Sequence, residues 1–176
     1  AAKEEIYEAA SAKATRIYNL DNPLTAKMYQ GAAQKFPLSR LITFSSQDLS
    51  ADVSLKVESM DLQSLTISGR IMKEEGRVRI SVFGAQNLTN LMAAAAIGLA
   101  AGLSPQQVWQ GLHHCKTIWG RNQLLDLKSG AQMIFDGYNA NPDSMSALLE
   151  NVKILAPKGR KIGVFAEMLE MGSLAG

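Results

Sequence analysis

The chain has 176 residues, enough for one domain or one and a half, and its 47% hydrophobic and 19% charged residues are ordinary for a soluble globular protein. Eighteen Lys and Arg against 16 Asp and Glu leave a formal net charge of +2, which gives no reason to expect nucleic acid or an anionic membrane as a partner. A single cysteine, Cys115, excludes a disulfide within the chain and favours a reducing, cytoplasmic setting. The longest apolar run, residues 91–103, is too short to span a bilayer.

Helical and extended patterns alternate in the first half of the sequence. A helix is predicted over 3–14, a strand over 15–20, a helix over 24–33 and a strand over 38–44. Three further segments alternate apolar and polar residues, as strands with one buried face do, and the short connections between them predict antiparallel pairing. These segments are 53–60, 62–71 and 77–83, with a turn at Lys73-Glu74-Glu75-Gly76 before the last.

After residue 83 the pattern becomes helical. A long Ala-rich helix is predicted over 88–101, capped by Gly102, and Ser104-Pro105 opens a second helix that ends near residue 113. Residues 116–122 form a predicted linker. The elements expected after it are strands over 123–127 and 132–136, a helix over 142–155 and a buried strand over 161–165. Because this order is typical of a parallel α/β domain, we predict two domains, residues 1–118 and 119–176.

The loop after the second of these strands carries the chemistry. Asp136 stands at the carboxyl end of a strand, where open α/β sheets bind their ligands. The loop 137–141 adds amide and hydroxyl groups, and the unpaired N–H groups of a helix start can hold an anion. Without any family resemblance, these residues favour a purely structural interpretation. Asn141 before Pro142 is a good helix cap, and Asp143 suits a first turn.

The run Asp136-Gly137-Tyr138-Asn139-Ala140-Asn141-Pro142-Asp143-Ser144-Met145 resembles a signature of the Mur ligase family, in the branch that adds D-alanyl-D-alanine. Sister ligases and folylpolyglutamate synthases typically carry Ala-His before the Asn-Pro. The resemblance implies that Asp136 meets the ribose of ATP. It also implies that the incoming dipeptide lies near four side chains, those of Tyr138, Asn139, Asn141 and Ser144.

Two preceding segments resemble the same family in the same order. The run GAQNLTNLMAAA, residues 84–95, looks like G-x-H-N-x-x-N-x-x-A-A-A, which implies that Asn90 contacts adenine and that Asn87 belongs to the same nucleotide site. The alternative is that both asparagines hold the start of the helix. Gln86 replaces the family's histidine and cannot carry its charge. Gly120-Arg121 matches a linker pair whose arginine reaches a nucleotide phosphate as the domains close; without the family, Arg121 would simply be solvated.

The start and end of the chain resemble the family as well. Ala2-Lys3-Glu4-Glu5-Ile6-Tyr7 is similar to A-K-x-E-I-[F/Y], whose lysine is carbamylated in many members. This implies that Lys3 is a catalytic residue and, once carbamylated, supplies oxygen ligands to Mg²⁺; otherwise it is a surface lysine. The weaker match at 163–172 has Ala166 and Glu167 where the family has Gly and Asp, and Phe135 stands where the family often has a second Asp.

Taken together, the resemblance implies an α/β chain. It would comprise the second half of a Mur ligase central ATPase domain, with a mixed sheet containing antiparallel strands plus helices, followed by the start of a Rossmann-like C-terminal domain. The implied function is an ATP-dependent amide-bond ligase of peptidoglycan precursor synthesis, which joins D-alanyl-D-alanine to UDP-N-acetylmuramoyl-tripeptide. ATP first phosphorylates a carboxylate, and the amine then attacks the acyl phosphate. We expect ATP and Mg²⁺ as cofactors and a cytoplasmic monomer that binds neither nucleic acid nor membrane.

The chain contains no G-x-x-x-x-G-K-[ST] phosphate loop, and both ends look cut. We therefore expect a fragment that neither hydrolyses ATP nor forms the amide bond alone. Two alternatives stay open. One is another ligase of the superfamily, such as a murein-peptide recycling or folylpolyglutamate-type enzyme, which the 138–141 loop disfavours. The other is a non-catalytic homologue, which the departures at Gln86, Phe135 and Ala166 favour.

Overall fold

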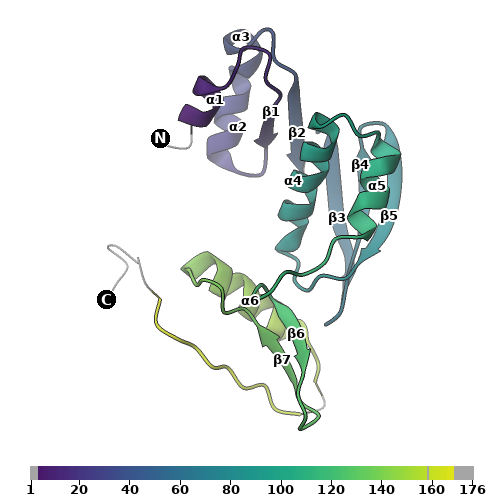
Figure 1. The fold of residues 1–176 in the computed structure, drawn as a ribbon, viewed down its shortest axis with the longest axis vertical. Coiled ribbons are helices and arrows are strands. Elements are labelled where there is room, and N and C mark those ends of the chain that lie inside the picture. Colours follow the sequence, from purple (N-terminus) through teal and green to yellow (C-terminus); the bar gives the residue numbers. More distant parts are fainter. Residues whose placement is uncertain (1–3, 158, 169–176) are drawn as a thin grey trace.

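A computed structural model describes residues 4–157 and 159–168 (Figure 1). Its helices and strands follow the predicted order through residue 154, except that the helix predicted over 24–33 is divided into two helices at Gly31. In chain order they are α1 (Glu5–Ala9), β1 (Arg16–Asn19), α2 (Pro23–Gln30), α3 (Ala32–Lys35), β2 (Leu41–Ser45), β3 (Val53–Met60), β4 (Leu65–Ile71), β5 (Glu74–Ile80), α4 (Asn87–Ala100), α5 (Pro105–His113), β6 (Gln123–Asp126), β7 (Gln132–Phe135) and α6 (Pro142–Ile154).

The main sheet is mixed and has the order β1-β2-β3-β4-β5. β1, β2 and β3 run parallel, with Ile17 opposite Ile42 and Phe44 opposite Val53. β3, β4 and β5 form an antiparallel meander. The α/β fold class and the antiparallel set predicted from the alternating pattern are therefore confirmed.

The core lies between this sheet and the helices α4 and α5, which cover one of its faces (Figure 1). α4 contacts β2 and β3, whereas α5 lies against β5. The Ala-rich sequence of α4 explains the close approach, since Ala95 and Ala96 are buried beside Met92. From the sheet, the buried side chains are mainly β-branched or Leu: Ile42, Phe44, Val53, Leu55, Leu65, Ile67, Ile71 and Ile80.

The predicted helix boundaries around α5 are confirmed. Gly102 follows α4 with a φ of +92°, the left-handed conformation that glycine adopts without steric cost. Ser104 caps α5: its hydroxyl accepts a hydrogen bond from Gln107 N, and the Gln107 side chain accepts one from Ser104 N. Across the described residues, no helix is both long and apolar enough to cross a membrane.

Two predicted boundaries in the first half are wrong. The first helix ends at Ala9 rather than near residue 14. The buried Arg16 guanidinium donates hydrogen bonds to the carbonyls of Tyr7 and Ala10, which therefore do not continue the helix. The turn before β5 is not Lys73–Gly76. Ile71 already pairs with Glu74, so the turn consists of Met72 and Lys73, and Met72 has a φ of 55°.

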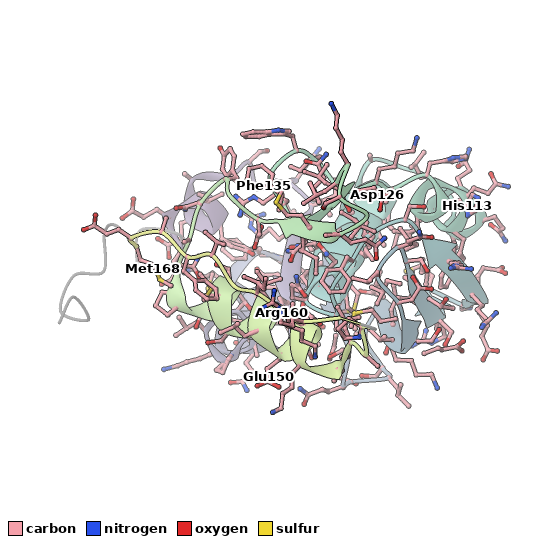
Figure 2. The ribbon with its side chains drawn as sticks, turned by 90° about the horizontal axis from the view of Figure 1, so that it is seen from below. His113, Asp126, Phe135, Glu150, Arg160 and Met168 are labelled. Carbon is pink, nitrogen blue, oxygen red and sulfur yellow. The ribbon has the colours of Figure 1, made fainter. Side chains whose placement is uncertain are left out.

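β6, β7 and α6 lie below the main sheet in Figure 1, with β6 and β7 paired antiparallel. The buried strand predicted over 161–165 is wrong. Figure 2 shows an extended segment from Arg160 to Met168 running along α6, and no strand of the described chain pairs with it. Ile162 and Val164 are 76% and 93% exposed. Lys161 Nζ instead donates to two carbonyls at the end of α6. The apolar character of this run predicts burial, but a strand also needs a neighbour with which to pair.

Candidate functional site

The linker and the loop after β7 are joined at Asp136. This residue directly follows β7, and its Oδ1 accepts a hydrogen bond from the backbone N–H of Asn122 at 3.1 Å. Two residues further on, Tyr138 N donates to Gly120 O at 3.1 Å. Oδ2 of Asp136 makes no hydrogen bond with any described residue. One carboxylate oxygen is thus fixed by the linker while the other is available to a ligand.

Arg121 and Tyr138, both exposed, lie against each other. The guanidinium carbon is 4.4 Å from the centre of the Tyr138 ring, a distance at which a cation interacts favourably with the ring face. Gly120 makes this approach possible, because it has a φ of +70° and an added Cβ would lie 3.3 Å from the Tyr138 backbone nitrogen. The structure therefore brings the segments that carry Arg121, Asp136 and Tyr138 together.

The rest of the loop is held by its own side chains. Asn141 Oδ1 accepts from Ser144 N at 2.8 Å and Ser144 Oγ accepts from Asn141 N at 3.2 Å, a reciprocal cap of α6. Asn139 Oδ1 accepts from Ala140 N at 2.9 Å. The capping interpretation of Asn141 is confirmed. Its amide nitrogen makes no hydrogen bond with any described residue, so capping leaves a donor for a ligand.

The two asparagines of the other motif lie at the start of α4. Asn87 Nδ2 donates to Phe83 O at 2.8 Å, which fixes the turn that precedes the helix. Asn90 is exposed, and its amide makes only a long 3.4 Å contact with Asn87 Oδ1. Neither side chain accepts a hydrogen bond from a helix N–H group, so neither is an N-cap of the usual kind. Asn87 has a structural role, whereas Asn90 presents its amide to solvent.

A third group of polar residues lies at the carboxyl ends of β1 and β2. Asp21 accepts hydrogen bonds from the hydroxyl of Ser45 and from both the N–H and the hydroxyl of Ser46. Burial raises the pKa of this carboxyl, but the combined hydrogen bonds outweigh burial, and the pKa lies below its ordinary value. Asp21 is thus a satisfied anion that ties the two strand ends together.

Comparison with known proteins identifies the family. The profile of the Mur ligase middle domain matches residues 1–98, more than half of the chain, and that of the Mur ligase glutamate ligase domain matches residues 120–176. The chain belongs to the Mur ligase family. The domain boundary at 118/119 stays a prediction.

The Mur ligase chain resembles UDP-N-acetylmuramoyl-tripeptide–D-alanyl-D-alanine ligase of Bacillus subtilis, with 31% identity over 98% of this chain and 35% of that protein. Among solved structures, MurF from Acinetobacter baumannii is 26% identical with a TM-score of 0.75, covering 88% of this chain and 32% of that one. MurF from Thermotoga maritima in complex with ADP shares the fold, at 20% identity and a TM-score of 0.70 over 86% of this chain and 33% of that one. The chain spans about a third of the length of these relatives.

Lys3, the predicted catalytic residue and metal ligand, lies outside the described residues. Within them, no group of three or more His, Cys, Asp or Glu side chains could hold a metal ion. Mg²⁺ therefore rests on the resemblance alone.

A contact that the sequence patterns do not predict joins the two motif regions. Asn151 on α6 is 6% exposed and hydrogen bonds to Ala85 and Gln86, just before α4. Hydrophobic periodicity gives no signal for such a residue, because a buried amide looks like any polar residue on a helix surface. A second missed contact is the edge-to-face pair of Trp119 and Phe135, with ring centres 5.5 Å apart.

Proposed function

We propose that this chain is part of an ATP-dependent carbon–nitrogen ligase that joins D-alanyl-D-alanine to UDP-N-acetylmuramoyl-tripeptide in peptidoglycan precursor synthesis. The observation that carries the proposal is the loop 136–145, which has the signature of this branch and a strand-end carboxylate, Asp136, that accepts a hydrogen bond from the linker at Asn122 N. The Bacillus subtilis relative of that name, 31% identical over nearly the whole chain, supports it. A cytoplasmic monomer that uses ATP and Mg²⁺ remains part of the same proposal.

The chemistry assigned to this chain is binding and orientation. ATP would transfer its γ-phosphoryl group to the tripeptide carboxylate, and the amine of the dipeptide would displace phosphate from the resulting acyl phosphate. In this proposal the unpaired oxygen of Asp136 accepts hydrogen bonds from ribose hydroxyls, and the amide of Asn90 pairs with the adenine edge. Arg121 offers a planar guanidinium to a phosphate.

The dipeptide-binding role of the loop is consistent with the groups that its own structure leaves available. The hydroxyl end of Tyr138 is exposed, and Asn141 keeps a free N–H donor after capping α6. Asn139 and Ser144 would act mainly by fixing the backbone, because their side-chain oxygens already bond within the loop. Lys3 stays the candidate for carbamylation and for Mg²⁺ binding.

The test is phosphate release by the whole protein that carries this chain. We expect release only when D-alanyl-D-alanine and UDP-N-acetylmuramoyl-tripeptide are both present. Asp136→Asn removes the charge but keeps the shape, and should raise the KM for ATP roughly 10- to 100-fold, the range for a lost hydrogen bond to a charged group. Equal turnover with a single amino acid in place of the dipeptide would contradict the proposal.

A further inference from the structure

The buried surface of α6 has an unusual composition. Asn151 is the sole buried residue of this helix, at 6% exposure, whereas the apolar Leu149 and Ile154 on the same helix are 49% and 68% exposed. A surface helix normally buries its apolar stripe and exposes its amides. The contact of α6 with the rest of the molecule is therefore centred on a polar group.

Asn151 uses every kind of hydrogen bond that its amide can make. Its Oδ1 accepts from Ala85 N at 3.2 Å, and its Nδ2 donates to Gln86 Oε1 at 2.5 Å and to Ala147 O at 2.7 Å. Two of these bonds cross to the 84–86 loop, 65 and 66 residues earlier in the chain. A buried amide with partners this specific fixes one orientation of the two segments, because any other would leave it unsatisfied.

The 84–86 loop is shaped to present Gln86. Gly84 is buried with a φ of +103°, and a Cβ at this position would lie 2.3 Å from Gln86 Oε1 and 2.4 Å from its Nε2. The Gln86 amide thus folds back over a bare glycine to reach Asn151. Gln86 directly precedes α4, so whatever fixes Gln86 also fixes the first turn, which carries Asn87 and Asn90.

We propose that Gln86 and Asn151 form an interdomain latch that positions the first turn of α4 for the adenine moiety of a bound nucleotide. The pair touches no nucleotide itself and acts through Asn87 and Asn90, so both members are positioning residues. This inference rests on the proposed nucleotide-binding function of Asn90, but not on which amino acid or dipeptide the ligase adds. Gln86, which stands where the family has a histidine, accepts a hydrogen bond from Asn151 in this contact.

The latch itself is tested by amide hydrogen exchange in the whole protein. Asn151→Ala should speed exchange of the Ala85 amide on the order of 10-fold, since its acceptor is gone. Asn151→Asp keeps the acceptor for Ala85 but cannot donate to Gln86, so it should retain most of this protection. Glu150→Ala, on the exposed neighbouring position, is the matched control. An Ala85 amide that exchanges equally fast in wild type and Asn151→Ala would overturn the latch.

The positioning role is tested by the Kd for ADP, measured by titration calorimetry on the same proteins. Asn151→Ala, Asn151→Asp and Gln86→Ala should each weaken ADP binding by about 10-fold, a typical coupling between sites. Exchanging the two residues, Gln86→Asn with Asn151→Gln, keeps their summed length and should restore part of the affinity. A purely structural role would lower the unfolding temperature and leave the Kd unchanged, which would overturn the proposal.

The same titration separates this inference from the proposed ligase. If wild type binds ADP but does not join D-alanyl-D-alanine, the substrate assignment fails while the latch is still tested by the Kd series. If wild type does not bind ADP, the latch has no nucleotide site to position and is overturned.

Discussion

Asn141 has two proposed roles that one pair of substitutions separates. As a cap, it supplies Oδ1 to Ser144 N at 2.8 Å. As a substrate-binding residue, it would use the N–H groups of its amide, which are free of described partners. Asn141→Ala removes both functions, whereas Asn141→Asp keeps an acceptor at the helix start and removes the donor.

The size of the capping effect follows from the exposure of this site. Asn141 is exposed, so water reaches Ser144 N once the cap is lost, and the cost should stay near the typical value of about 1 kcal/mol. That is roughly a 5-fold change in the folding equilibrium, or about 2–4 °C in the unfolding temperature for a chain of this size. Asn141→Asp should match or slightly exceed wild-type stability, because a carboxylate favours the positive end of the helix dipole.

The assay is thermal unfolding followed by circular dichroism, together with the KM for D-alanyl-D-alanine of the whole protein. We expect Asn141→Ala to lose stability and raise KM, and Asn141→Asp to raise KM alone. Glu150→Ala, an exposed substitution further along the same helix and outside the loop, is the matched control. If Asn141→Asp were as unstable as Asn141→Ala, the capping argument would be wrong. If Asn141→Asp kept the wild-type KM, the substrate-binding role of Asn141 would be wrong.

Three further predictions concern the body of the fold. Gly69→Ala should cost about 3 kcal/mol or more in urea unfolding, since Gly69 has a φ of +145° and an added Cβ would lie 2.1 Å from Ser54 O; wild-type stability would contradict this. Hydrogen bonds hold the pKa of Asp21 below its ordinary value despite burial. The ionised carboxylate therefore contributes fully to the free energy of unfolding above about pH 4, and this contribution is lost as pH falls through the folded pKa. Asp21→Asn should therefore flatten the acid side of the stability curve, and an unchanged curve would refute the assignment. Burial raises the pKa of Cys115, so iodoacetamide should alkylate it more slowly at pH 8 than in the urea-unfolded chain, and equal rates would contradict the burial.

Local signals in the sequence predicted most of the elements correctly. The capping sequence before α5, the proline after Asn141 and the alternating pattern of β3 and β4 each act within a few residues, and each is found in the structure. The wrong boundaries have non-local causes. The first helix is shortened by the Arg16 side chain, and the run 161–165 lacks the paired neighbour that a strand requires.

The candidate site divides in the same way. Asp136, Arg121 and Tyr138 were predicted as site residues from the motifs. Arg121 meets Tyr138 because two hydrogen bonds join the linker to the loop, one from Asn122 N to Asp136 Oδ1 and one from Tyr138 N to Gly120 O. The contact of Gln86 with Asn151 was not predictable, because it joins residues 65 positions apart through a pair of amides. Neither Gln86 nor Asn151 belongs to a hydrophobic pattern, so sequence periodicity does not indicate that they are in contact.

Because the contact between Gln86 and Asn151 is polar, it differs from an apolar interface in how firmly it holds the two segments. An apolar interface gains free energy with every Å² that it buries, so opening it becomes costly as it grows. Hydrogen bonds that exchange with water contribute only about 0.5–1.5 kcal/mol each, and inter-domain surfaces of this polar kind permit relative motion. The Asn151–Gln86 contact therefore selects one relative orientation of the two segments, but it contributes little free energy to keeping them together. That combination would suit the proposed ligase, in which Arg121, now resting on Tyr138, would exchange its aromatic partner for a nucleotide phosphate.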